Sequence, residues 1–155
     1  MSPIDDSVIS LQEITQETLW PILKLEVSDK QNHFVASNAV SIAQAHFSDH
    51  AWFRAIYANE TPVGFVMLYI DEEKPEYELW RFMIDKNYQG KGYGNRALEQ
   101  VIDYVRTLPD AREMFTSYVP GDGNPGPFYR RLGFIETGEV EHDENVMRLS
   151  LGGDA

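Results

Sequence analysis

Apolar residues in this chain of 155 residues recur at helical spacing in some stretches and form short runs in others. The helical spacing predicts helices over Glu17–Val27 and Asn38–Phe47, with Asn38 as the N-cap of the second. The same spacing from Ala97 to Val105 predicts a third helix, which Pro109 ends. The short runs are rich in aromatic and β-branched residues and predict strands. These strands are Val8–Ile14, Trp52–Tyr57, Val63–Ile70, Tyr77–Ile84, Met114–Val119, Phe134–Val140 and Val146–Leu151.

The middle of the chain predicts the centre of a sheet. Residues 58–62 have turn chemistry of the right length to join Trp52–Tyr57 and Val63–Ile70 as a hairpin. Tyr77–Ile84 is almost continuously apolar from Leu79 onward, which is typical of a strand covered on both faces. We therefore expect this strand to lie centrally.

The C-terminal third predicts a short helix and a last pair of strands. Pro127–Leu132 is the expected helix, with Pro127 in its first turn and Gly133 at its C-terminal cap. Glu141–Asn145 is expected to be an acidic turn between the last two strands. The order of elements predicts a mixed α/β (α+β) sheet covered by helices. No linker or internal repeat divides the chain, so residues 1–155 are expected to form one domain.

Composition narrows the classes of function. The 25 acidic and 13 basic residues give a net charge of −12, which argues against nucleic-acid binding and favours cationic partners. With no cysteine, the chain has no thiolate nucleophile, disulfide or cysteine-bound metal. The longest apolar run, Val63–Ile70, is too short for a membrane span, and the two aspartates in Met1–Ser7 do not fit a signal peptide. We expect a cytoplasmic protein without membrane contact.

A metal site is not expected either. His46 and His50 are four residues apart, but Phe47 stands where a zinc-binding H-E-x-x-H motif requires glutamate. Surface or capping roles account for such histidines more simply.

Gln89–Gly94 places three glycines between a buried strand and an amphipathic helix. Backbone N–H groups in such a loop, together with the positive end of the helix dipole, suit a pyrophosphate. A plain connecting turn would also explain the glycines. A Walker loop is excluded because Asp85 and Gly92 occupy positions that require glycine and serine or threonine. Residues 121–126 do satisfy G-x-G-x-x-G, but too little chain follows for a dinucleotide-binding fold.

Two motifs resemble the GNAT N-acetyltransferase family. Leu79–Asp85 followed by Gln89–Gly94 resembles the family's Gln/Arg-x-x-Gly-x-Gly acetyl-CoA motif, and Phe128–Phe134 resembles the segment whose tyrosine lies beside the thioester sulfur. The resemblance implies the GNAT fold, with a central sheet of six to seven strands and about four helices, and acetyl-CoA as cosubstrate. Many relatives carry asparagine where this chain has Asp122, and Asn124 is the nearby alternative. The cofactor-binding residues that the resemblance implies are Phe82, Met83, Ile84, Gln89, Gly90, Lys91, Gly92, Tyr93, Gly94, Asn95, Asn124 and Arg131.

The resemblance also assigns the chemistry. Tyr129 would give its phenol proton to the leaving CoA sulfur, and backbone N–H groups of Met83 and Ile84 would polarise the thioester carbonyl. Glu78 would act as the base toward the amine, directly or through water. A core tyrosine and a solvated carboxylate are the simpler alternatives for Tyr129 and Glu78. No metal and no covalent enzyme intermediate are expected.

The acceptor is expected to be a small cationic amine. The chain is most similar to bacterial diamine and spermidine acetyltransferases, partly through Val35–Asn38 and Ser41–Ala45. An acidic run could attract a polycation; it comprises Asp71, Glu72, Glu73, Glu76 and Glu78. Basic residues gather instead around the two CoA motifs, namely Lys91, Arg96, Arg130 and Arg131. Three alternatives stay open, namely an aminoglycoside acceptor, a peptide or protein acceptor, and a catalytically silent acyl-CoA-binding sensor. A homodimer is also left open.

Overall fold

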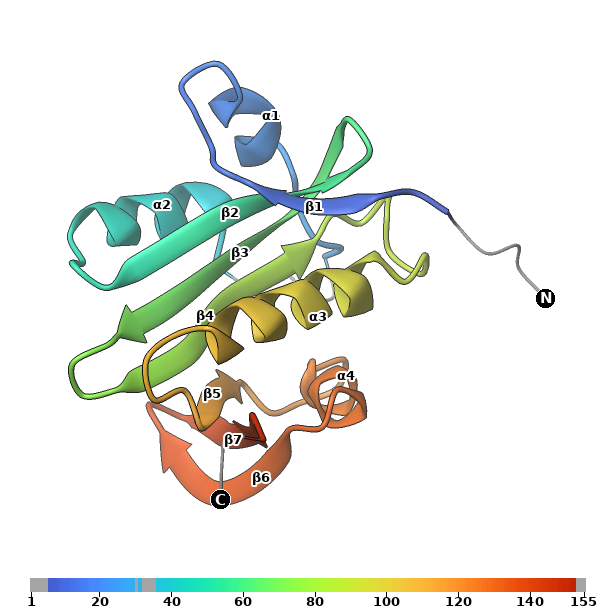
Figure 1. The fold of residues 1–155 in the computed structure, drawn as a ribbon. Helices are drawn as coiled ribbons and strands as arrows, with labels where there is room; N and C mark the ends of the chain where they lie inside the picture. The colour runs from blue at the N-terminus through green and yellow to red at the C-terminus, as the bar shows by residue number, and fades with distance from the viewer. Residues whose placement is uncertain (1–5, 30, 32–35, 153–155) are drawn as a thin grey trace.

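The structure is a computed structural model that describes residues 6–29, 31 and 36–152. In this part of the chain, seven strands form one sheet in the order β1-β2-β3-β4-β5-β7-β6, and four helices accompany it (Figure 1). All neighbouring strands are antiparallel except β4 and β5, which are parallel. The strands are β1 (Ile9–Gln12), β2 (Ala51–Ala58), β3 (Thr61–Asp71), β4 (Glu76–Ile84), β5 (Glu113–Tyr118), β6 (Ile135–Glu141) and β7 (Glu144–Ser150). The helices are α1 (Leu19–Leu23), α2 (Asn38–His46), α3 (Tyr93–Arg106) and α4 (Gly126–Arg131).

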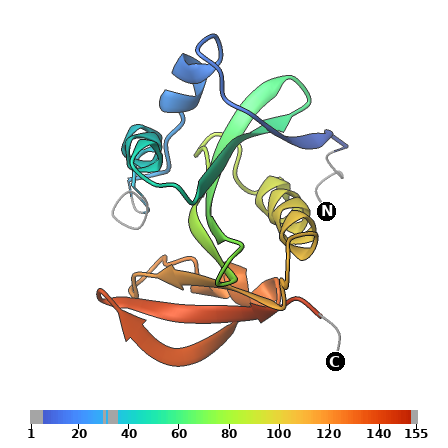
Figure 2. The same ribbon diagram turned by 60° about the vertical axis from the view of Figure 1, so that its left-hand side comes forward.

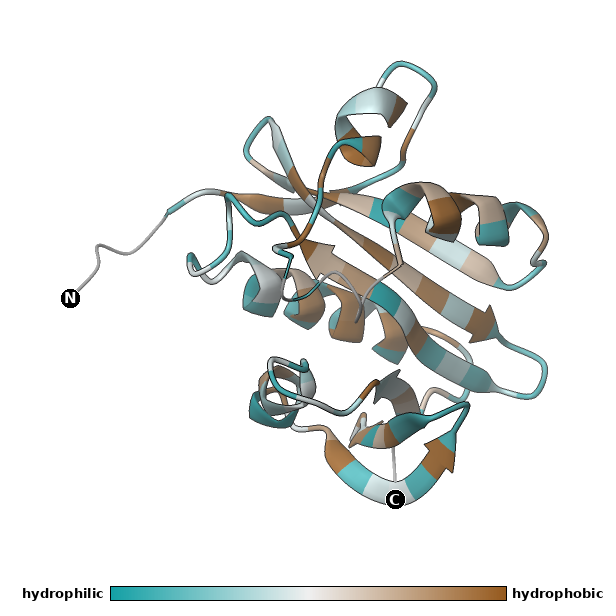
Figure 3. Cartoon of the chain, turned by 180° about the vertical axis from the view of Figure 1, so that it is seen from behind, coloured by the Kyte–Doolittle hydropathy of each residue, from teal (hydrophilic) through white to brown (hydrophobic). Residues whose placement is uncertain are grey.

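Helices cover both faces of the sheet. Helix α3 lies on one face of β1–β4, whereas α1 and α2 lie on the other (Figure 2). The face of α3 that carries Ala97, Leu98 and Val101 is buried, as its apolar spacing predicts. Apolar residues accordingly line the strands between these layers (Figure 3). Strand β4 has buried residues in both core clusters, Leu79 in one and Met83 in the other, which confirms its predicted central position.

The region before β2 differs from the sequence prediction. Helix α1 spans only Leu19–Leu23, because Leu25 and Val27 leave the helical path to pack against the second core cluster. The N-cap of α2 is Ser37, whose hydroxyl accepts a hydrogen bond from Val40 N. Asn38 turns inward instead, where its buried side chain donates to the carbonyl of Ile22 at 2.8 Å. Asn38 thus ties α2 to α1 rather than capping a helix.

The last hairpin is tighter than predicted. His142 and Asp143 both have positive φ, at 49° and 65°, which is the geometry of a two-residue type I′ turn. The strands therefore extend to Glu141 and Glu144, which pair across the turn. Glu144 consequently belongs to β7, next to β5. Among the described residues, no helix is long and apolar enough to cross a membrane.

Candidate active site

The sheet separates into two parts at β4 and β5. These strands pair only through Glu78 with Phe115 and Leu79 with Thr116, and then diverge (Figure 2). Across from this point, the register between β3 and β4 shifts, which marks a β-bulge that adds twist at a functional edge. A cavity of about 910 Å³ fills the divergence and is lined by the rest of β4, the glycine loop, the end of β5 and α4.

The β4 edge that faces this cavity carries backbone N–H groups. Asp85 N donates to the Val63 carbonyl of β3, and successive N–H groups of a strand point to opposite edges. The N–H of Ile84 therefore faces the cavity, where no described strand pairs with it. The N–H of Met83 faces β3 instead. Of the two donors expected to polarise a carbonyl, only Ile84 thus has the required direction, although both residues line the cavity.

The loop 89–94 has the backbone shape of an anion cradle. Gly90 and Gly92 have φ of 79° and 81°, which side-chain-bearing residues rarely adopt, and open space lies beside both. Gly92 is also the N-cap of α3, so the positive end of that helix dipole faces the loop. A Cβ on Gly94 would lie 3.4 Å from Phe82 Cζ, so the loop packs closely on β4 there.

The side chain of Gln89 holds this loop in place rather than pointing out of it. Its Nε2 donates to the Ile84 carbonyl at 2.8 Å and to Gln31 Oε1 at 2.9 Å. Lys91, by contrast, is exposed and does not line the cavity. The cradle is therefore built mainly from backbone groups.

A buried carboxylate joins the start of this loop to the segment after α1. Asp85 is 4% exposed, and its two oxygens accept from Glu26 N and Asn87 N, each at 2.9 Å. Lys86 forms an ion pair with Glu26 at 2.8 Å on the surface of the same junction. Val27, one residue further on, lines the cavity. The wall formed by this segment and the glycine loop are thus held together.

Tyr129 lies on α4, is buried and lines the cavity. Its ring contacts those of Phe128 and Phe134, with centroids 5.7 and 5.8 Å away. Burial raises the pKa of Tyr129 to about 12, with a further increase from the negative charge of Glu144, while a hydrogen bond with Thr116 opposes the shift. The phenol therefore holds its proton throughout the physiological range.

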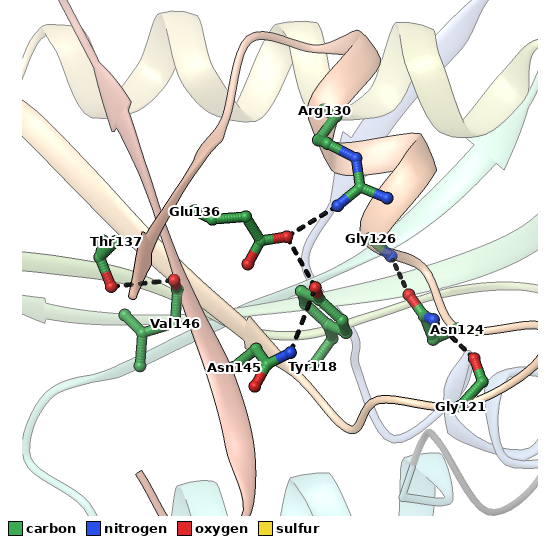
Figure 4. Close-up of polar contacts among 9 residues, drawn as sticks. All are labelled: Tyr118, Gly121, Asn124, Gly126, Arg130, Glu136, Thr137, Asn145 and Val146. Carbon is green, nitrogen blue, oxygen red and sulfur yellow. Dashed lines mark hydrogen bonds and ion pairs between the residues drawn. The ribbon is translucent and has the colours of Figure 1, made fainter. Parts of the chain in front are cut away.

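Asn124 shapes the loop before α4. Its Oδ1 accepts from Gly126 N at 2.8 Å, and its Nδ2 donates to the Gly121 carbonyl at 2.6 Å (Figure 4). Asp122 is exposed and does not line the cavity, whereas Asn124 does. Both polar atoms of Asn124 thus have partners within its own loop.

Glu78 lies just before the divergence, half-buried beside the cavity rather than among its lining residues. Burial raises its pKa, and the negative charges of Glu141 and Glu144 raise it further, whereas Arg81 opposes the shift. A carboxylate with a raised pKa is suited to accept a proton near neutral pH. Its two neighbours come from the β6–β7 hairpin, far away in the sequence.

The rest of the predicted acidic run does not reach the cavity. Asp71 is buried and accepts from the backbone N–H groups of Glu73 and Lys74, so it shapes the β3–β4 turn. His50 Nε2 lies 3.7 Å from the same carboxylate. Among the described residues, no group of three histidines or carboxylates is arranged to hold a metal ion.

The fold brings most of the predicted residues to one cavity. Those that line it are Phe82, Met83, Ile84, Gln89, Gly90, Gly92, Tyr93, Gly94, Asn95, Asn124, Tyr129 and Arg131. Lys91 and Glu78 lie outside the lining. Arg130, one of the basic residues around the CoA motifs, forms an ion pair with Glu136 at 2.7 Å.

Comparison with known proteins assigns the family. The sequence profile described as the Acetyltransferase (GNAT) family matches residues 12–134, which is most of the chain. The chain belongs to this family. The acetyltransferase is 30% identical over 150 residues to a protein of Bacillus subtilis subsp. natto described as a probable spermine N(1)-acetyltransferase. That match covers 92% of this chain and 99% of the relative.

Solved structures share the fold of this acetyltransferase at lower identity. A chimera of the Vibrio cholerae spermidine N-acetyltransferase SpeG and hSSAT has a TM-score of 0.70 and 17% identity, covering 93% of this chain and 96% of the other. The PaiA N-acetyltransferase of Thermoplasma acidophilum, solved with coenzyme A, has a TM-score of 0.68 and 15% identity, covering 92% and 99%. The expected GNAT fold, with its mixed sheet and four helices, is confirmed.

Several cavity residues of the acetyltransferase were not predicted from its sequence. Thr116, Ser117 and Tyr118 come from β5, and Glu144 comes from β7. Nothing in the local sequence marks these residues, because their position depends on how β5 and β7 pair.

Proposed function

We propose that this acetyltransferase transfers the acetyl group of acetyl-CoA to a primary amine of a polyamine or diamine, with both substrates bound at once. The observation that carries the proposal is the single cavity that joins the glycine loop, the open edge of β4 and the buried phenol of Tyr129. An anion cradle, a donor directed at a carbonyl and a group that holds its proton thus line the same cavity.

The residues present fit acetyl-CoA. The backbone of Gly90 and Gly92, at the N-terminus of α3, would hold the pyrophosphate. The N–H of Ile84 would donate to the thioester carbonyl, where negative charge develops during acyl transfer. Arg131, on the exposed side of the cavity, would face the anionic end of the cosubstrate.

Two side chains would handle protons. Tyr129 holds its proton at Oη, because burial keeps the phenol neutral, and would direct it at the leaving sulfur. Glu78 would accept the proton of the amine through a water molecule, since its carboxylate lies beside the cavity and not within it. The raised pKa of Glu78 favours this role.

The charge beside the cavity favours an acceptor with more than one ammonium group. Besides burial, the negative charges of Glu141 and Glu144 raise the pKa of Glu78, and Arg81 only partly opposes them, so carboxylates outnumber cations around Glu78. An ammonium group remote from the reacting amine would supply that charge. The similarity to a probable spermine acetyltransferase supports the same class of acceptor.

The test is a salt titration of kcat/KM with spermidine, putrescine and a monoamine, measured by release of free CoA. Because the Debye length falls to about 8 Å at physiological salt, kcat/KM for spermidine should fall most steeply. The Glu144→Gln variant should flatten the spermidine slope, whereas Glu73→Gln, in the exposed β3–β4 turn, should leave it unchanged.

The outcomes separate the alternatives. Equal salt slopes for the three amines would reject a polyamine and direct the search to aminoglycosides or peptides. Tight binding of acetyl-CoA without CoA release for any amine would identify an acyl-CoA sensor and reject the transfer reaction.

A further inference from the structure

Helix α4, which carries Tyr129, is too short to be stable without the surfaces on which it packs. Helix α4 has six residues, and its N-cap residue, Pro125, forms no capping hydrogen bond through its side chain. Helices of this length are unstable in isolation, because nucleation is costly and few backbone hydrogen bonds repay it. The position of Tyr129 must therefore be set by the surfaces on which α4 rests.

The first turn of α4 rests on Tyr118 of β5. A Cβ on Gly126 would lie 3.1 Å from Tyr118 Cζ, so the helix backbone packs directly on this ring. Gly126 N also donates to Asn124 Oδ1, which fixes the entry into the helix. Thr116, two residues before Tyr118 and also buried, donates to the Leu79 carbonyl and lies close enough to the Tyr129 phenol to lower its pKa. One face of β5 thus supports both the helix and its tyrosine.

Glu136 of β6 connects Tyr118 of β5 to the last turn of α4. The hydroxyl of Tyr118 donates to Glu136 Oε2 at 2.7 Å, and Arg130 Nη1 donates to the same oxygen at 2.7 Å (Figure 4). Asn145 Nδ2 lies 3.4 Å from the Tyr118 hydroxyl and donates to it from β7. Arg130 directly follows Tyr129 in the chain. The carboxylate therefore connects the strand beneath α4 to the residue next to the phenol.

We propose that Glu136 is a positioning residue, which sets the place of the Tyr129 phenol in the cavity through Arg130 and Tyr118. The proposal rests on the role of Tyr129 in the proposed function. Glu136 and Arg130 are both about half exposed, at 40% and 48% of their side chains. An exposed ion pair contributes little to folding. Loss of Glu136 should therefore lower the reaction rate more than it lowers stability.

The first measurement compares Glu136→Ala with Glu139→Ala, an exposed carboxylate on the same strand. Glu136→Ala should lower kcat on the order of tenfold, because small displacements of a reacting group are costly, and should change KM for acetyl-CoA less than about twofold. Glu136→Gln keeps an acceptor oxygen and should restore part of the rate. Glu139→Ala should match the wild type, and a loss of kcat equal to that of Glu136→Ala would overturn the proposal.

The decisive measurement repeats Glu136→Ala in a Tyr129→Phe background. If Glu136 acts through the phenol, the second substitution should cause little further loss of kcat. A further loss as large as in the wild-type background would show an independent role and overturn the proposal. If Glu136→Ala does not fold, Tyr118→Phe gives a second test, because it removes only the hydroxyl that donates to Glu136. It is measured in the wild type and in Tyr129→Phe.

The proposed function can fail separately from this inference. If wild-type protein releases no CoA with any amine, or if Tyr129→Phe alone retains full kcat, the assignment of Tyr129 is wrong, and the positioning role falls with it. If Tyr129→Phe lowers kcat but Glu136→Ala and Tyr118→Phe do not, only the inference about Glu136 is wrong.

Discussion

Replacing Tyr129 with phenylalanine isolates the contribution of one oxygen atom. The ring contacts with Phe128 and Phe134 remain, so the packing of α4 and the binding of acetyl-CoA should be kept. What the variant loses is the phenol hydroxyl of a residue that lines the cavity. The expected effect is therefore on kcat.

The size of the effect follows from the pKa of the phenol. A thiol has a pKa of about 8.5, whereas burial and Glu144 raise that of Tyr129 to about 12. Complete transfer of the proton to a thiolate would be uphill by about 3.5 pK units, or roughly 5 kcal/mol. Tyr129 is thus better suited to donate a strong hydrogen bond to the developing thiolate than to give up its proton fully. Hydrogen bonds to charged groups contribute about 1.5–3 kcal/mol, which is about 10- to 150-fold in rate.

The assay is CoA release at saturating acetyl-CoA and amine, from pH 7 to 11. Tyr129→Phe should lower kcat on the order of 10²-fold with little change in KM for acetyl-CoA. At pH values below 11, the wild-type kcat should show no fall caused by ionisation of Tyr129, because the phenol stays protonated. The reasoning is refuted if kcat stays within about twofold of the wild type. It is also refuted if wild-type kcat falls near pH 10, the ordinary pKa of tyrosine, and Tyr129→Phe removes that fall.

Three further predictions test the surroundings of the cavity. The raised pKa of Glu78 means that the folded state holds its proton more tightly, so wild-type stability should fall as pH rises above the ordinary value of 4.5. In urea unfolding, Glu78→Gln should match the wild type below that pH and be more stable at pH 7, and the opposite order would contradict this cause of the shift. Gly94→Asp should abolish the rise in Tm that acetyl-CoA causes, by adding bulk against Phe82 and a negative charge at the cradle. An unchanged rise would place the pyrophosphate elsewhere. Asp85→Asn leaves one oxygen for two backbone donors and should lower the free energy of unfolding by about 1–3 kcal/mol, with Asp122→Asn as an exposed control. Equal stability of both variants and the wild type would remove Asp85 as a structural tie.

The parts of this structure that depend on local sequence could be predicted, and those that depend on strand pairing could not. The amphipathic spacing of α3 and the glycine loop before it are local properties, and both occur where the sequence indicates. The burial of Asp71 could not be inferred from its acidic neighbours, because it results from the turn that its carboxylate organises. The direction of the Met83 N–H likewise depends on which edge of β4 pairs with β3.

The position of Glu144 shows the same limit on the functional side. Read as part of an acidic turn, residues 141–145 carry no chemistry. The two-residue turn at His142 and Asp143 instead moves Glu144 into β7, where it lines the cavity and raises the pKa of Glu78 and Tyr129. The sequence does not contain this pairing register in any recognisable local signal.

Only two residue pairs join β4 to β5, fewer than join any other neighbouring strands of the described sheet. Local opening of a protein follows such sparsely bonded boundaries, so the unit formed by β5, β6, β7 and α4 should open as a group before β2 and β3 do. Acetyl-CoA in the proposed site would contact both β4 and this unit, and would thereby stabilise the junction between them. In amide hydrogen exchange without ligand, the amides of β5 and α4 should therefore exchange before those at the centre of β3, and acetyl-CoA should slow the amides of β5 and α4.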